Sequence, residues 1–260
     1  MPNRPNILWL MTDEQRADSL GYTSTSWART PNLDAVARQG TRFTAAYTPS
    51  PVCVSARACM LTGRYGSSIG VLNNHHRLAL DDPQFLTWTL AAHGYQVAGF
   101  GKHHYNCARR AFDVEVDHVL GDRVHYFKYQ VPVDTEEADV VRYDGGKSPW
   151  LFAGRFPGTV EDMPEMFVVN QAVDWLRRRD PSRPYCLRLS FNAPHTPVVT
   201  PAPFDTLIDP DAIDLPLDRA QEMSLVSDTH RDHLCDYAGT HRLTEAQVRR
   251  ARQCYYGHVA

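Results

Sequence analysis

The feature that most constrains the fold of this chain is a continuous apolar run close to its beginning, Ile7–Met11, with the sequence Ile-Leu-Trp-Leu-Met. Polar residues bound the run on both sides. A strand of this length without an alternating polar face is typical of a parallel sheet that is covered on both faces, as in α/β proteins. We therefore predict an α/β fold in which this strand is buried on both faces.

Polar residues follow this strand directly, at Thr12, Asp13 and Glu14. Open α/β sheets bind ligands at the carboxyl ends of their strands. Two adjacent carboxylates at such a position suit a hard divalent cation such as calcium or magnesium. A helix N-cap with a first-turn glutamate gives the same pattern, so the residues alone leave both interpretations open.

Further helices and strands alternate along the chain. A helix is predicted from Pro31, with Thr30 as its N-cap and Gly40 as its stop, and a strand is predicted over Arg42–Tyr47. The apolar stripe that should pack this helix into the core consists of Leu33, Val36 and Ala37. The later predicted segments are a loop over 66–80, a helix over 85–94, a strand over 95–100, a helix opening at 160–164, a strand over 184–191, a surface loop over 200–218 and a helix from Thr244.

The segment Pro51–Arg64 combines three features that together indicate an oxyanion site. A helix is predicted from Val54 to Thr62, which places Cys53 at or just before its N-terminus. Free N–H groups and the helix dipole favour anions there and lower a thiol pKa. Arg57 lies one turn further on the same face. A small buried cysteine that opens a core helix, with Arg57 in a structural ion pair, fits the segment equally well.

Two more polar groups follow predicted strands. Lys102 and His104 come directly after one strand and could bind an anion and transfer a proton, although a solvated turn is an alternative. His195 follows another strand and is flanked by prolines, which stiffen its loop. In the polar stretch 73–77, Asn74 is a candidate for lining a substrate pocket, and surface solvation explains most of its neighbours.

The cysteine segment resembles the sulfatase signature C-x-P-S-R-x-x-x-L-T-G-R. The residues in register are Cys53, Arg57, Leu61, Thr62, Gly63 and Arg64. Ser55 stands where the family usually has proline and sometimes alanine, and Ala56 where it usually has serine. The other motifs keep the family order: Asp13 in the acidic metal pair, with Glu14 as a departure, then G-K-x-H at Lys102 and P-H-x-P at His195.

This resemblance implies an alkaline-phosphatase-like α/β fold, with a largely parallel sheet flanked by helices on both faces. It also implies a metal-dependent hydrolase of sulfate esters whose Cys53 is oxidised to formylglycine by a maturation enzyme. Asp13, Glu14 and modified Cys53 would bind the metal, expected to be Ca²⁺, with Mg²⁺ or Mn²⁺ as alternatives. Cys53, Arg57, Lys102, His104 and His195 would be catalytic. Asn74, Lys102 and His195 would contact the substrate, a small-molecule or saccharide sulfate ester.

The resemblance reaches only the N-terminal part of a sulfatase, because the family's later metal pair and second lysine have no counterpart here. We expect residues 1–260 to form the N-terminal portion of a single catalytic domain that is truncated at its C-terminus, with 106–160 as an insertion near the active site. Two alternatives stay open. The chain could hydrolyse phosphonate or phosphate esters, or, because Ser55 departs from the maturation pattern, it could be an inactive or incomplete member that only binds ligand.

Composition and charge argue against several other classes of protein. The chain has 43% hydrophobic and 22% charged residues, a net charge of -3 and a pI near 6.4, without a long basic tract, so nucleic acid is not an expected partner. No run reaches the roughly 18 apolar residues of a membrane span. The N-terminus has no signal-peptide core, and the six cysteines are scattered, so we expect reduced thiols and a cytoplasmic location.

Overall fold

The structure is a computed structural model that describes residues 4–23, 27–78, 85–107, 110–117, 141–143, 150–215, 227–228 and 243–260. The chain divides into two compact units. The first comprises Met1–Asp13, Phe43–Gln130 and Asp162–Asn192, and the second comprises Glu14–Arg42, Val131–Glu161 and Ala193–Ala260. Each unit therefore draws on three separate stretches of the sequence.

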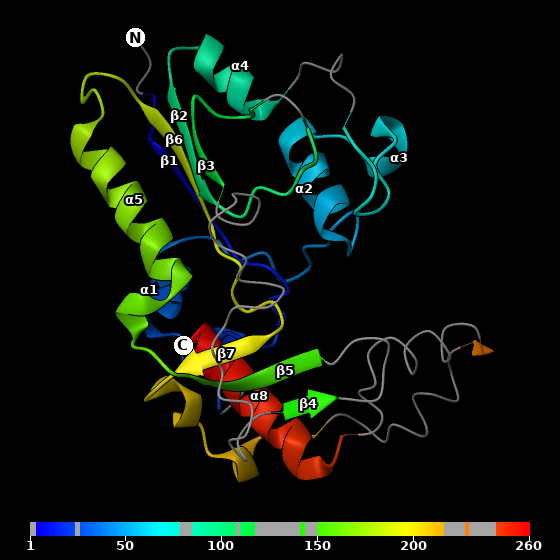
Figure 1. The fold of residues 1–260 in the computed structure, drawn as a ribbon. Coiled ribbons are helices and arrows are strands. Elements are labelled where there is room, and N and C mark those ends of the chain that lie inside the picture. Colours follow the sequence, from blue (N-terminus) through cyan, green and yellow to red (C-terminus); the bar gives the residue numbers. More distant parts are fainter. Residues whose placement is uncertain are drawn as a thin grey trace. The chain divides into compact units, whose positions relative to one another are not determined.

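A four-stranded parallel sheet forms the centre of the first unit (Figure 1). Its strands, in spatial order, are β1 (Ile7–Met11), β6 (Tyr185–Ser190), β2 (Gln96–Gly101) and β3 (Val114–Asp117). The register aligns Met11, Ser190 and Gly101 across the three neighbouring strands, so their carboxyl ends are level. The segments that leave these strands consequently start at one edge of the sheet.

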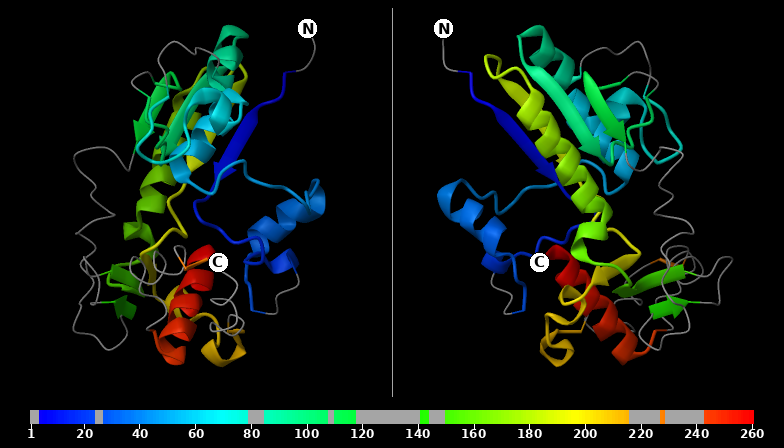
Figure 2. Two further views of the ribbon diagram at one scale, coloured as in Figure 1. Left: turned by 90° about the vertical axis from the view of Figure 1, so that its right-hand side faces the viewer. Right: turned by 60° about the vertical axis from the view of Figure 1, so that its left-hand side comes forward.

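Helices cover both faces of this sheet (Figure 2). One face packs against α2 (Cys53–Thr62) and α4 (Leu86–Ala92), and the other against α5 (Pro164–Arg178). Neighbouring strand residues alternate between the two faces, as Val97 and Ala98 do on β2. A short helix, α3 (Gly66–Ile69), lies within the segment predicted as a loop. The predicted layers of an α/β fold are confirmed.

The predicted burial of β1 on both faces is wrong. Leu8 and Leu10 are 55% and 53% exposed, although they share the face that α5 covers elsewhere. The reason is that β1 is the edge strand of the sheet, while α5 packs on β2 and β6. An uninterrupted apolar run therefore marks a strand here without showing that both of its faces are covered.

The second unit contains a three-stranded sheet in the order β4 (Val141–Tyr143), β5 (Trp150–Phe156) and β7 (Val198–Pro201). The pair β4–β5 is antiparallel and the pair β5–β7 is parallel. Helix α8 (Glu245–Val259) packs against β5 and β7 (Figure 1) and begins with a capping box formed by Thr244 and Gln247. The second unit also contains a short helix, α1 (Pro31–Gln39), and three 3-10 helices: η1 (Gly21–Thr23), η3 (Phe204–Thr206) and η4 (Pro210–Ala212). A further 3-10 helix, η2 (Val160–Asp162), lies where the chain passes from the second unit to the first.

Three local predictions need correction. Helix α1 has the predicted caps but no buried residue, and Val36 of its expected core stripe is 68% exposed. The segment Arg42–Tyr47 is not a strand, and its Phe43 and Tyr47 are 81% and 89% exposed. The predicted loop over 200–218 includes the end of β7 together with η3 and η4.

The predicted insertion over 106–160 contributes β3, β4 and β5, while 118–140 and 144–149 lie outside the described residues. Across the described ranges, no helix combines the length and the apolar character that crossing a membrane requires.

Candidate active site

Two strand ends of the first unit place charged side chains at the carboxyl edge of the sheet. Asp13 lies two residues beyond β1 and Lys102 directly follows β2, and both are buried. Gly101, the last residue of β2, has φ 96°, in the left-handed region that favours glycine. A Cβ at Gly101 would lie 2.1 Å from the carbonyl oxygen of Ser190, so this close approach also requires glycine.

Helix α2 supplies the cysteine and an arginine. Cys53 is the first residue of α2, as predicted, and Arg57 follows one turn later with 1% exposure. The side-chain oxygen of Asn74 accepts a hydrogen bond of 3.0 Å from the backbone N–H of Val54, which satisfies one of the free donors at the helix start. The Ser55 hydroxyl, on the buried side of the helix, donates to the carbonyl of Val71 at 2.6 Å. These contacts fix the beginning of the helix that carries Cys53.

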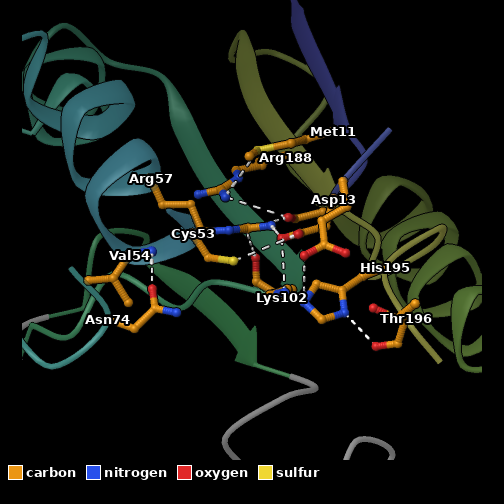
Figure 3. A network of polar contacts seen from close by, with 12 residues as sticks. Met11, Asp13, Cys53, Val54, Arg57, Asn74, Lys102, Arg188, His195 and Thr196 are labelled. Carbon is orange, nitrogen blue, oxygen red and sulfur yellow. Dashed lines mark hydrogen bonds and ion pairs between the residues drawn. The ribbon is translucent and has the colours of Figure 1, made fainter. Parts of the chain in front are cut away.

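The four side chains meet in one polar cluster of the first unit (Figure 3). One Asp13 oxygen, Oδ2, accepts from Arg57 Nη2 at 2.7 Å and from Lys102 Nζ at 2.9 Å. The other oxygen, Oδ1, lies 3.8 Å from Cys53 Sγ. Arg57 Nη1 donates to Ser190 Oγ at 2.8 Å and also to the carbonyl of Lys102. The cluster therefore places a thiol, a carboxylate and two cations within direct contact distance.

The charges in this cluster set the ionisation of Asp13. Burial opposes ionisation, but the positive charges of Lys102 and Arg57 outweigh it and hold the pKa of Asp13 below its usual value. Asp13 is therefore a carboxylate at neutral pH. With two cations against one carboxylate, these three side chains carry an excess positive charge beside Cys53, which suits an anionic ligand.

Glu14 and His195 belong to the second unit, where they form a pair. Glu14 Oε1 lies 3.3 Å from His195 Nε2, and the other ring nitrogen of His195, Nδ1, lies 2.6 Å from the carbonyl oxygen of Thr196. Glu14 has a left-handed backbone, with φ 58°, that is uncommon for a residue other than glycine. The hydroxyl of Tyr255 holds this turn, because it donates to the Glu14 carbonyl at 2.9 Å and accepts from Arg16 N–H at 2.7 Å.

Among the residues predicted from the sequence, Asp13, Cys53, Arg57 and Lys102 are thus in direct contact. His104 is half-buried, with φ 43°, and its catalytic role stays a prediction. Asn74 contacts the start of α2, and its role toward a substrate also stays a prediction.

Sequence reasoning missed Ser190 and Tyr255. Both act through hydroxyl groups within regular elements, where no local motif distinguishes them from ordinary strand and helix residues.

A parallel sheet with helices on both faces and a polar cluster at its carboxyl edge is what an alkaline-phosphatase-like fold requires, and it is shared with other α/β folds. Solved structures agree. The phosphonate monoester hydrolase of Agrobacterium radiobacter superposes with a TM-score of 0.74 over 98% of this chain and 56% of its own, at 21% identity. The phosphonate monoester hydrolase SpPMH of Silicibacter pomeroyi gives a TM-score of 0.69 over 98% of this chain and 56% of its own, at 23% identity. The predicted fold is confirmed.

The chain belongs to the sulfatase family, whose sequence model matches residues 5–260. An arylsulfatase of Clostridium perfringens is 30% identical over 76% of this chain and 45% of its own length. A choline-sulfatase of Rhizobium meliloti is 27% identical over 99% of this chain and 51% of its own length. The chain thus spans about half the length of the curated relatives that it matches.

Proposed function

We propose that this chain carries the nucleophile end of a sulfate ester hydrolase site. The single observation that carries the proposal is the cluster in which Cys53 opens α2 beside Asp13, while Arg57 and Lys102 bind the same carboxylate oxygen. A sulfuryl group that is attacked gathers negative charge on its peripheral oxygens. Fixed cations in a buried position stabilise such charge without reorganisation.

In the proposed site, Cys53 acts after conversion to formylglycine, and its position at the helix N-terminus directs it toward the cations. Arg57 is held on two sides, by Asp13 and Ser190, so its guanidinium orients the attacking group. Lys102 neutralises a sulfuryl oxygen from the end of β2. His195 assists departure of the alcohol and contacts the sulfate, and His104 orients the nucleophile.

The residues present also fit a divalent cation. Asp13 keeps Oδ1 directed toward Cys53 while its Oδ2 is bound by the two cations, and Glu14 follows as the next carboxylate in the chain. Such oxygen donors suit Ca²⁺, with Mg²⁺ or Mn²⁺ as alternatives. A bound cation would supply Lewis-acid stabilisation of a deprotonated oxygen. We propose Asp13, Glu14 and the modified Cys53 as its ligands.

The length of the relatives and the exposed face of β1 support a further part of the proposal. We propose that residues 1–260 are the N-terminal portion of one catalytic domain, with 106–160 as an insertion that selects the substrate. Both faces of a parallel sheet are normally covered by other parts of the protein. Leu8 and Leu10 of β1 are more than half exposed here, so they leave a face that the rest of a catalytic domain would cover. The substrate would be a small-molecule or saccharide sulfate ester.

The experiment that tests the proposal combines the mass of the Cys53 peptide with turnover. Conversion of the thiol to an aldehyde removes sulfur, so co-expression with a formylglycine-generating enzyme should lower the mass of that peptide. An aryl sulfate should then be hydrolysed by the converted protein, and Cys53→Ala should abolish the reaction. Faster turnover of a phosphonate monoester would assign the site to that chemistry instead. An unconverted thiol in a folded protein that lacks both activities would refute catalysis.

A further inference from the structure

A second buried arginine, Arg188, lies in the middle of strand β6. The register places it between Trp9 of β1 and Gly99 of β2. Strand alternation puts Leu187 and Leu189 on the face covered by α5, so Arg188 and Ser190 point to the opposite face, where α2 packs. Arg188 is 1% exposed. A guanidinium group is costly to bury in a strand unless it is paired and hydrogen-bonded, so its contacts show what stabilises it there.

The contacts of Arg188 fix its guanidinium in one place. It lies over the ring of Trp9, with Cζ 4.8 Å from the ring centroid, in the geometry of a cation–π interaction. Its Nη2 lies 3.4 Å from Met11 Sδ and 3.5 Å from Ser190 Oγ (Figure 3). The space beside Gly99 is already filled, because a Cβ there would approach the ring of His103 to 2.6 Å and that of Phe112 to 2.8 Å.

Ser190 connects Arg188 to the cluster at the sheet edge. The hydroxyl oxygen that faces Arg188 Nη2 also accepts from Arg57 Nη1 at 2.8 Å. Arg57 in turn donates through Nη2 to Asp13. Two guanidinium groups therefore converge on one hydroxyl oxygen. Arg57, Lys102 and Arg188 thus bring three positive charges to the side of Asp13 and Ser190, where they favour an anionic ligand.

We propose that Arg188 is a positioning residue for oxyanion binding: it holds the Ser190 hydroxyl against Arg57 and adds positive charge behind it. This inference rests on the proposed function, in which Arg57 orients the attacking group and Lys102 neutralises a sulfuryl oxygen. It assigns to Arg188 and Ser190 a role that the sulfatase signature does not contain, since both lie in a strand outside every motif.

The test measures binding of inorganic sulfate to the 260-residue chain by calorimetry at low salt. Arg188→Met keeps the length and apolar stem of the side chain but removes its charge, and we expect about tenfold weaker sulfate binding. Ser190→Ala should weaken binding about threefold. Because Arg188 acts through Ser190, the double variant should bind no more weakly than Arg188→Met alone. Arg188→Lys restores the charge and should recover most of the loss.

The matched control is Arg177→Met on α5, which removes the same charge from a side chain that is 75% exposed. Its sulfate affinity should stay within about twofold of wild type, because an exposed charge surrounded by water contributes little. Near-UV circular dichroism and the thermal midpoint show whether each variant is folded.

Unchanged sulfate affinity in folded Arg188→Met, or additive losses in the double variant, would overturn the inference. Should Arg188→Met fail to fold, Ser190→Ala decides instead, and an unchanged affinity in that variant overturns it equally. A wild-type chain that binds no sulfate would overturn the proposed function, and this inference with it. Equal binding by wild type and Arg188→Met would overturn only the inference.

Discussion

Replacing Asp13 by asparagine should destabilise the first unit strongly while leaving its shape almost unchanged. The substitution removes one negative charge from between Arg57 and Lys102, which are 1% and 3% exposed. Neither cation can turn to water without disturbing α2 or the end of β2. Two positive charges would therefore stay buried with a neutral amide in place of the carboxylate between them.

The magnitude follows from the two contacts of 2.7 and 2.9 Å. At an effective dielectric constant of about 20, each contact is worth roughly 6 kcal/mol before the cost of desolvation is subtracted. Removing one partner from a buried ion pair typically costs about 3–5 kcal/mol. We expect Asp13→Asn to lower the free energy of unfolding by that amount, which is a large part of the stability of a typical domain.

The assay is urea denaturation followed by circular dichroism and by tryptophan fluorescence. The matched control is Asp18→Asn, which breaks a pair of 2.6 Å with Arg16 whose side chains are 42% and 59% exposed. This control should cost less than about 1 kcal/mol. Equal effects of the two substitutions would refute the argument from burial. A triple variant that combines Asp13→Leu, Arg57→Met and Lys102→Met should recover much of the stability, because it removes the buried charges altogether.

Three further predictions concern other parts of the chain. Gly101→Ala should cost about 2–5 kcal/mol in urea denaturation, because the new Cβ would meet a strand carbonyl oxygen at 2.1 Å and φ is 96°; Gly63→Ala, with φ 67° and open space, should cost only about 1–2 kcal/mol. Burial lowers the pKa of His103 to about 3 and of His258 to about 4, so the unfolded chain takes up protons below pH ~6.5 that the folded chain does not. The free energy of unfolding should therefore fall as the pH is lowered from 7 through 6 to 5, by up to about 1.4 kcal/mol per pH unit for each histidine. If His103→Phe left the slope of unfolding free energy against pH unchanged, that result would contradict the contribution assigned to His103. Ser55→Ala removes a buried hydrogen bond, at a cost of about 1 kcal/mol, yet it should raise the aldehyde fraction of the cysteine peptide during co-expression with a maturation enzyme; an equal or lower fraction would show that the serine is not what limits conversion.

The resemblance to the family named the members of the central cluster, and local rules explain why their side chains meet. Asp13 and Lys102 directly follow parallel strands whose carboxyl ends must meet at one edge. Cys53 and Arg57 are one helical turn apart, so a helix start next to that edge brings both side chains in together. The alternation of helices and strands indicated a parallel sheet. The local rules did not tell which strands are neighbours in that sheet.

Other features depend on tertiary arrangement, which a local pattern does not contain. The sequence predicted that the leucines of β1 are buried, whereas the structure leaves them exposed, because an apolar run does not show which strand lies at the edge of a sheet. The apolar stripe of α1 was predicted to pack into the core for the same reason, although no residue of this helix is buried. Ser190 and Tyr255 gained their importance only from residues far away in the sequence, namely Arg57 and Glu14.

The pairing of β1 with β6 has a consequence for how the chain is synthesised. Ile7 pairs with Cys186, about 180 residues further along, and β1 pairs with no other strand of the described sheet. A ribosome adds about 5–20 residues per second, so β1 waits roughly 10–40 seconds for its partner to emerge. During that interval Leu8 and Leu10 are exposed in a nascent chain, where chaperones can bind them. Asp13 reaches its final position only after β6 has been made, so the carboxylate that organises the cluster is among the last parts of the first unit to be fixed.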